Sequence, residues 1–150
     1  MAARPRTRRG TPPLTRSEVM ARVRGRDTGP EMLVRRMLHA MGYRYRVQLR
    51  VVGRRRPDLA FTRRRAAVFV HGCFWHGHDC ARGSRKPKAN AEFWRAKIAR
   101  NRQRDQETVA ALASDGWCSL VIWECALKDE AAVSEELRRF LGPPKPSDAR

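Results

Sequence analysis

The segment His71-Gly-Cys-Phe-Trp-His-Gly-His-Asp-Cys80 decides how this sequence is interpreted, because few folds need thiol and imidazole groups at such density. An apolar run over residues 66–70 precedes it and predicts a short strand that delivers the chain to the segment. Tetrahedral zinc takes four thiolate or imidazole ligands. We therefore expect a structural zinc site here, and not disulfides, since the cysteines lie among histidines.

The fourth zinc ligand should come from another part of the chain, because so short a loop supplies at most three ligands without strain. The candidates are Cys118 and Cys125. Cys118 lies inside an apolar run and is interpreted as a small buried core residue, whereas Cys125 lies just beyond that run. His71 and His76 then remain available for chemistry. The predicted zinc ligands are Cys73, His78, Cys80 and Cys125.

A helix and three strands are predicted before this segment. The helix begins at Thr28, where Thr28 and Glu31 form a capping-box pattern, and it ends at Gly42. Strands are predicted over residues 43–48, 58–62 and 66–70, with a tight basic turn over residues 63–65. The last two strands would form a hairpin that leads into the His and Cys segment.

Two helices and one strand are predicted after the segment. Asn90 can cap a long helix that runs to about Ser114 and stops at Gly116, with Phe93 interpreted as a core residue. Residues 117–123 predict a strongly buried strand, and residues 130–141 predict a last helix. Helices that flank a small sheet of mixed strands give an α/β fold.

The composition indicates one domain that binds nucleic acid. The 150 residues carry a formal charge of +18, which is typical of proteins that neutralise phosphates. A basic surface that only aids solubility, or one that binds a membrane, would leave the aromatic and metal-type residues unexplained. We predict a basic disordered arm over residues 1–13, a folded domain over 14–141 and a disordered tail over 142–150.

Neither a membrane span nor a secretory signal is found in the sequence. No apolar run is long enough to cross a bilayer, and the arginines at the start are followed by no apolar stretch. We therefore expect an intracellular, cytoplasmic and nucleoid-associated protein without a membrane partner. No coiled coil demands a dimer, so we expect a monomer.

A second constellation is Arg56-Pro-Asp58, at the start of the predicted hairpin. Many nucleases hold Mg²⁺ against the scissile phosphate with an acidic residue placed in this way. A Pro-Asp pair alone more often marks a turn, so this prediction depends on the neighbouring cluster. Large rings are the third feature: those of Phe74, Trp75 and Trp94 are suited to unstack base pairs.

Taken together, these residues resemble the Vsr endonucleases of very short patch repair. The resemblance runs in order from about Ser17 to Phe140 and is carried by a long set of unusual motifs. These are Gly53-Arg-Arg-Arg-Pro-Asp58, Val70-His-Gly-Cys-Phe-Trp-His-Gly-His-Asp-Cys80, Glu92-Phe-Trp94, Asn101, Asp105, Gly116-Trp117 and Val121-Ile-Trp-Glu-Cys-Ala-Leu127.

The resemblance implies a restriction-endonuclease-like core, and a magnesium-dependent nick on the 5′ side of the thymine in a T·G mismatch left by deamination of 5-methylcytosine. It implies a functional link to a DNA cytosine methyltransferase and to mismatch-repair proteins. Asp58 and the backbone carbonyl of Val70 would hold Mg²⁺, although Val70 replaces the family's usual Thr. His76 would be the general acid or base, with Glu31 and His71 in support. Phe74, Trp75 and Trp94 would intercalate beside the mismatch, and the implied zinc ligands agree with those chosen from spacing.

Three alternatives remain open at this point. Glu31 could serve only as the capping-box residue of its helix. The chain could be a zinc-stabilised DNA-binding module without catalysis, against which only Asp58 and His76 argue. It could also be a nuclease of the same core fold with a restriction role.

Overall fold

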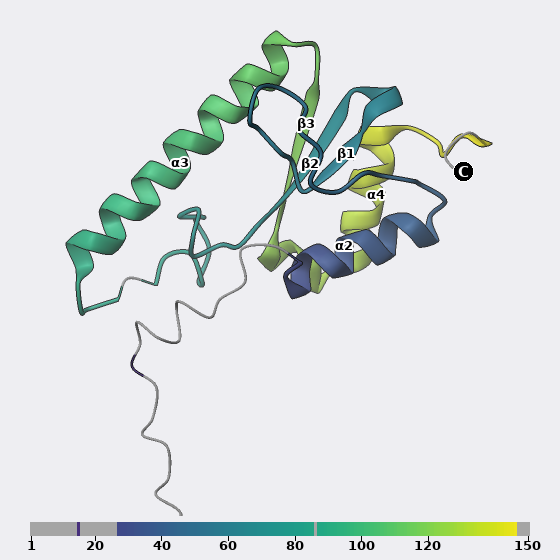
Figure 1. The fold of residues 1–150 in the computed structure, drawn as a ribbon. Coiled ribbons are helices and arrows are strands. Elements are labelled where there is room, and N and C mark those ends of the chain that lie inside the picture. Colours follow the sequence, from purple (N-terminus) through teal and green to yellow (C-terminus); the bar gives the residue numbers. More distant parts are fainter. Residues whose placement is uncertain (1–14, 16–26, 86, 147–150) are drawn as a thin grey trace, which may run out of the picture.

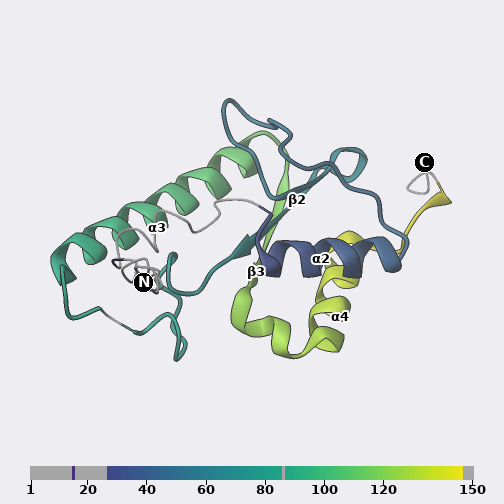
Figure 2. The same ribbon diagram turned by 60° about the horizontal axis from the view of Figure 1, so that its bottom comes forward.

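A small mixed sheet with helices on both faces forms the centre of the computed structural model (Figures 1 and 2). The structure describes residues 15, 27–85 and 87–146. The sheet has the order β1-β2-β3. β1 (Leu59–Phe61) is antiparallel to β2 (Ala66–His71), and β2 is parallel to β3 (Cys118–Trp123). The predicted α/β fold is confirmed, and the predicted hairpin is its first strand pair.

The basic turn between β1 and β2 is a short 3-10 helix, η1 (Thr62–Arg64), closed by Arg65 in the left-handed conformation with φ 50°. The strand predicted over residues 43–48 is wrong, because this segment contributes only one isolated bridge, between Arg46 and Ala60. Gln48 adopts a left-handed φ of 56°. An extended strand cannot continue through that conformation.

β3 is less buried than predicted, and Cys118 is exposed rather than part of the core. The reason is topological: among the described residues β3 is an edge strand that pairs only with β2, and Cys118 is its first residue. Ile122 is the fully buried residue of the strand, and Trp117 directly before it is also buried. The core interpretation of Cys118 is therefore corrected.

Helices α2 (Gly29–Ala40) and α4 (Glu130–Leu141) cover one face of the sheet (Figure 2). Thr28 caps α2 as predicted, and Gly42, with φ 95°, follows its end. Apolar residues from both helices and from all three strands form the main core, which includes Val34, Leu38, Leu59, Phe61, Val68, Ile122, Val133 and Leu137. This core holds the sheet on the face that α2 and α4 cover.

Helix α3 (Ala91–Ser114) lies on the other face, and only the end near Leu112 packs on the sheet. Its first half extends beyond the strands, alongside the loop that follows β2 (Figure 1). Two expectations fail at the start of this helix. Phe93 is 55% exposed rather than in the core, and Asn90 makes no side-chain cap but has a left-handed φ of 55°.

The predicted arm, residues 1–13, lies outside the described residues, as do residues 147–150 of the predicted tail. The first residues of that tail are hydrogen-bonded to the domain: the Tyr43 hydroxyl donates to the carbonyl of Gly142, and Arg64 donates to that of Pro143. Within the described ranges, none of the helices is both long and apolar enough to cross a membrane.

Candidate functional site

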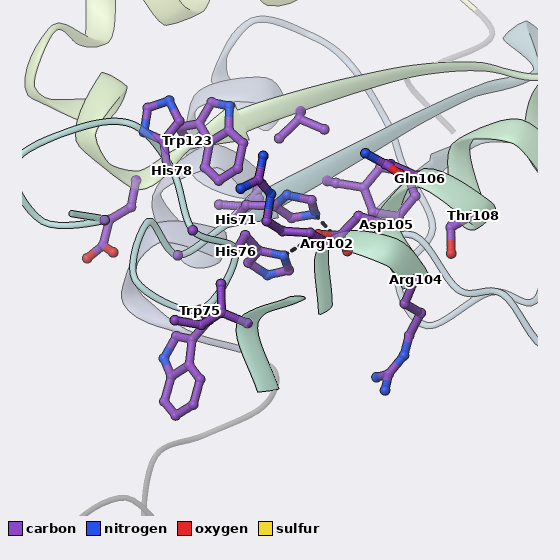
Figure 3. Close-up of a pocket in the computed structure, with 18 of the residues that line it drawn as sticks. His71, Trp75, His76, His78, Arg102, Arg104, Asp105, Gln106, Thr108 and Trp123 are labelled. Carbon is purple, nitrogen blue, oxygen red and sulfur yellow. Dashed lines mark hydrogen bonds and ion pairs between the residues drawn. The ribbon is translucent and has the colours of Figure 1, made fainter. Parts of the chain in front are cut away.

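A broad groove of about 2400 Å³ runs between α3, the start of α2 and the loop after β2 (Figure 3). Most of the residues predicted to carry chemistry line it, together with basic residues of the 54–56 turn and of α3. They are Glu31, Asp58, Val70, His71, Trp75, His76, His78 and Trp94. The structure thus brings together groups that lie up to 63 positions apart in the chain.

Asp58 lies directly before β1, and its carboxylate faces the backbone of β2. Its Oδ2 accepts a hydrogen bond from the N–H of Val70 at 2.7 Å. Burial raises the pKa of Asp58 to about 6; the Val70 hydrogen bond opposes this rise, and the negative charge of Glu31 adds to it. A cation beside this carboxylate would relieve both unfavourable effects, so the position suits a metal ion.

Glu31 is buried in the first turn of α2 and has a clear structural role. Its N–H donates to Oγ1 of Thr28 at 3.4 Å, and its carboxylate accepts from the N–H of Asp27 at 2.9 Å. It also forms an ion pair with Arg35 at 3.5 Å. The capping contacts are therefore present, and the charge of the same carboxylate acts on Asp58.

His71 and His76 form a stacked pair next to Asp105 of α3. Their ring centroids are 3.8 Å apart and the ring planes differ by 3°. Nδ1 of His76 donates to Oδ2 of Asp105 at 2.5 Å, since a carboxylate can only accept. The pKa of His71 is lowered to about 4, chiefly by burial and then by the charge of His76, while Asp105 opposes this shift. His71 is therefore neutral near pH 7.

The ligand atoms of this trio are close enough together to be considered for a metal ion. The lone pairs of an imidazole lie in its ring plane. Because the planes of His71 and His76 are parallel and stacked, their lone pairs do not converge on one point. In this arrangement the trio is suited to proton transfer rather than to metal binding.

Asp105 is the residue of this site to which the sequence analysis gave no role. The available signal was its spacing from Asn101, since residues four apart share one face of a helix. Asn101 donates from Nδ2 to the carbonyl of Trp75 at 2.9 Å, so this face of α3 holds the loop at two points. The pairing of Asp105 with His76 could not be read from the sequence alone.

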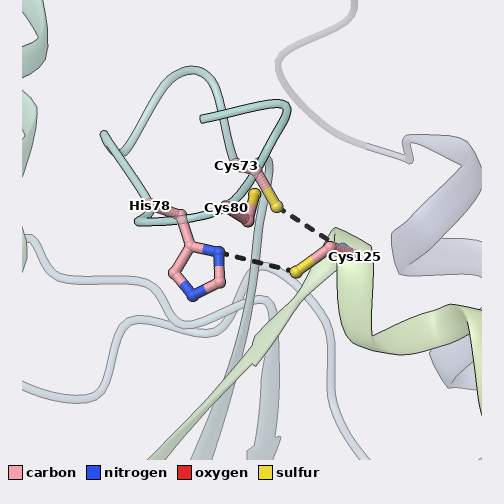
Figure 4. A group of neighbouring side chains, drawn as sticks. All are labelled: Cys73, His78, Cys80 and Cys125. Carbon is pink, nitrogen blue, oxygen red and sulfur yellow. Dashed lines mark hydrogen bonds between the residues drawn. The ribbon is translucent and has the colours of Figure 1, made fainter. Parts of the chain in front are cut away.

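A thiol and imidazole cage lies at the end of the sheet, formed by the four residues predicted from spacing (Figure 4). The ligand atoms of Cys73, His78, Cys80 and Cys125 all lie within 4.8 Å of one another. The parallel pairing of β2 and β3 brings two of these residues together. His71 pairs with Trp123, and a cysteine follows each of them two residues later.

The donor set of the cage fits a metal ion. The N–H of Gly83 donates to Sγ of Cys80, which chiefly lowers the pKa of that thiol to about 6. Burial raises the pKa of Cys73 to about 12, so a nearby cation is needed to keep it as a thiolate. Tetrahedral zinc with Zn–S bonds of about 2.3 Å places its sulfurs about 3.8 Å apart, which the observed spread accommodates.

The three rings predicted to contact DNA form one cluster on the other side of His76. Phe74, Trp75 and Trp94 meet edge to face with centroids 5.3 to 5.8 Å apart. The ammonium of Lys97 lies 5.2 Å from the Trp75 ring centre and 5.8 Å from that of Trp94. Trp75 points away from the histidine pair (Figure 3). The exposed ring of Phe93 extends the cluster from Trp94.

The fold defines the class of protein first. A solved structure, the catalytic domain of the homing endonuclease I-Bth0305I, matches with a TM-score of 0.50 and 22% identity, over 75% of this chain and 93% of that one. The two chains therefore share a fold.

The sequence comparisons then define the family. A model of the family described as DNA mismatch endonuclease Vsr matches residues 11–82. The type II nicking enzyme V.XorIIP of Xanthomonas oryzae pv. oryzae is 45% identical over 87% of this chain and 95% of its own length. The DNA mismatch endonuclease Vsr of Escherichia coli is 37% identical over 81% of this chain and 77% of its own. This chain belongs to the Vsr family of DNA endonucleases.

Proposed function

We propose that this endonuclease nicks one strand of duplex DNA on the 5′ side of the thymine in a T·G mismatch, in a reaction that depends on Mg²⁺. The observation that carries the proposal is that Asp58, the His71–His76 pair and the rings of Trp75 and Trp94 line one groove. Groups suited to phosphodiester cleavage and rings suited to base unstacking would therefore contact the same DNA duplex.

Asp58 and the carbonyl of Val70 would hold the magnesium ion, with Glu31 in support. The ion would supply Lewis-acid polarisation of the scissile phosphate and stabilise its developing charge. Asp58 is oriented for this role by the N–H of Val70, so its carboxylate is held in place before DNA arrives. Glu31 is anchored by its cap contacts and adds negative charge to the same place.

His76 would move the proton. Its Nδ1–H is committed to Asp105, which leaves Nε2 as the free nitrogen for acid–base work. His71 lies parallel to it as a neutral ring and prevents the imidazole of His76 from tilting. We propose that Asp105 is a positioning residue, since it acts on His76 and not on the substrate.

The cage would hold a structural zinc ion through Cys73, His78, Cys80 and Cys125. A filled cage would fix the loop that carries both His76 and the rings of Phe74 and Trp75. Phe74, Trp75 and Trp94 would enter the base stack beside the mismatch, where a wobble pair makes unstacking less costly. Lys97 would bring a positive charge to the flanking phosphate.

The type II nicking enzymes among the relatives favour single-strand cleavage over double-strand restriction. Substrates of the proposed kind arise where 5-methylcytosine deaminates. The proposal therefore includes a functional link to a DNA cytosine methyltransferase and to mismatch-repair proteins.

The test uses one duplex in two versions, with T·G or T·A at a single position, and a different label on each strand. With MgCl2 present, we expect a nick next to the mismatched thymine and intact T·A duplex; with EDTA both should stay intact. Cleavage of both duplexes would support a restriction role. Binding without cleavage of either would support a non-catalytic module.

A further inference from the structure

Trp123 connects the metal cage to the histidine pair. It is the last residue of β3, directly before η2 (Glu124–Lys128), the 3-10 helix that carries Cys125. Its indole ring stacks on the imidazole of His78, with centroids 4.1 Å apart and planes 13° from parallel. The same ring meets His71 edge-on at 5.3 Å and His76 at 6.3 Å.

Figure 3 shows this ring between His78 on one side and His71 and His76 on the other. In the part of the chain that the structure describes, no other aromatic ring contacts both groups. Trp123 also lines the groove and is only half-buried, so it is not simply a residue of the main core.

α3 holds the loop that carries these histidines at Trp75 and at His76, but the backbone of the loop adds little to this support. Its backbone hydrogen bonds from His76, Gly77 and His78 all return to the loop itself. Gly77 stands between the two imidazoles and adopts a φ of +60°. Glycine is the most permissive residue, so the backbone at this joint does not itself fix the orientation of His76 relative to the cage. Trp123 contacts the rings on both sides of the joint.

Trp123 itself is firmly placed. It pairs with His71 in the parallel register of β2 and β3, so its backbone is part of the sheet. Edge-to-face and stacked ring contacts each contribute about 0.5–1.5 kcal/mol beyond the area that they bury. Three such contacts on one rigid ring therefore favour the loop conformation that forms them.

We infer that Trp123 is a positioning residue that transmits the geometry of the cage to the His71–His76 pair. This inference rests on the proposed function, in which His76 moves the proton and the cage holds zinc. It has a specific consequence: altering this one ring should change both the rate of zinc release from the cage and the turnover rate.

The experiment compares zinc-loaded wild type with Trp123→Leu, which removes the ring, and Trp123→Phe, which keeps a smaller one. Trp123→Met tests the same loss of the ring if the leucine variant folds poorly. Zinc release to a chelator is followed with a zinc-sensitive dye. kcat and KM are measured on the mismatched duplex, and the imidazole signals of His71 and His76 are followed by NMR.

We expect Trp123→Leu to release zinc roughly 3- to 10-fold faster, which corresponds to the loss of one ring contact. Its kcat should fall about tenfold or more, with KM within about twofold of wild type, and the imidazole signals of His71 and His76 should shift. Trp123→Phe should recover most of each effect. If the ring were purely structural, its loss would lower thermal stability but would not reduce kcat while KM stays unchanged.

Trp117→Leu is the matched control, because Trp117 is buried in the separate cluster near Leu112 and contacts none of the histidines in the ring contacts described. It should lower the melting temperature while leaving zinc release and kcat unchanged below that temperature. If Trp123→Leu changes only one of zinc release and kcat, or neither, the inference is wrong. If the wild-type protein fails to nick the mismatched duplex, the proposed function is contradicted instead. The zinc-release and NMR measurements would still test whether Trp123 links the cage to the histidine pair.

Discussion

Oδ2 of Asp105, in the middle of α3, lies 2.5 Å from Nδ1 of His76 in the loop after β2. This contact joins α3, the longest of the described helices, to the loop that carries the cage. It also determines which nitrogen of His76 bears a proton, because a carboxylate can only accept a hydrogen bond. The orientation of the proposed acid–base group therefore depends on a helix that packs on the sheet only at its far end.

Replacing Asp105 with asparagine should reduce nicking about a hundredfold or more. The amide keeps the size of the side chain but loses the charge that orients and stabilises the imidazole, and acid–base catalysis contributes about 10²- to 10⁴-fold. Single-turnover nicking measures the rate, and a gel-shift assay should show unchanged DNA affinity. Asp115→Asn, at the end of α3, is the control and should behave as wild type. An unchanged rate in Asp105→Asn would remove this contact from the mechanism.

Changing Asp58 to alanine should abolish nicking and leave binding to the mismatched duplex within about twofold. The carboxylate is the proposed metal ligand, whereas most of the affinity should come from phosphate contacts of basic residues. Nicking is measured with saturating Mg²⁺, and binding is measured in the presence of Ca²⁺ or EDTA. Retained nicking would exclude Asp58 as an essential ligand.

The two cysteines of the β3 region should respond oppositely to substitution. Cys125→Ala removes a cage thiol, so zinc content should fall and the melting temperature should drop by about 10 °C or more, since metal binding is coupled to folding. Cys118→Ala alters an exposed residue at the start of the strand and should keep full zinc content. Elemental analysis and thermal melts decide the matter. A zinc-loaded, equally stable Cys125→Ala protein would show that the cage has another fourth ligand.

The exposure of Phe93 predicts that it contributes little to stability. Phe93→Ala should lower the free energy of unfolding by less than about 0.5 kcal/mol, as for other surface substitutions. Leu112 lies on the same helix but is fully buried. Leu112→Ala should therefore cost about 2–5 kcal/mol. Urea denaturation of both variants tests the difference, and a large loss in Phe93→Ala would restore its interpretation as a core residue.

Gly77 and Gly53 offer a comparison at nearly equal backbone angles. Their φ values are +60° and +57°, but a Cβ on Gly77 would lie 2.8 Å from Ile98, whereas one on Gly53 would meet nothing within 4 Å. Gly53→Ala should cost about 1 kcal/mol for the left-handed conformation alone. Gly77→Ala should cost more and should also slow nicking, because the loop would have to move away from α3. Equal losses in urea melts of the two variants would contradict this close contact.

The sequence predicted the parts of the site that local patterns encode. Cys73, His78 and Cys80 lie in one short segment, and Cys125 was chosen because it follows an apolar run; the structure places all four together. The contact between Asp105 and His76 spans 29 positions, and no periodicity reports which face of a long helix will meet a loop. Its geometry had to come from the fold.

The failed expectations have a common physical origin. Cys118 and Phe93 both belong to apolar patterns, which predict burial only if a neighbouring layer covers them. β3 is an edge strand and α3 extends beyond the sheet, so both residues remain exposed. The segment over residues 43–48 has a strand-like composition, but its pairing stops after one bridge because Gln48 turns the chain.

Cys73 and Cys125 each lie two residues beyond a paired residue, His71 or Trp123. The geometry of the cage therefore depends on the register of β2 and β3. Sliding β3 along β2 by a single residue would displace one sulfur by about 3.3 Å and turn alternate side chains to the opposite face. Such a displacement exceeds a whole Zn–S bond of about 2.3 Å. With the ion proposed here, a newly made chain would capture its metal tightly only after the two strands had found their correct partners. Molecules with a shifted register would not bind the metal and would remain susceptible to cellular proteases. Metal binding would therefore select the correctly folded molecules.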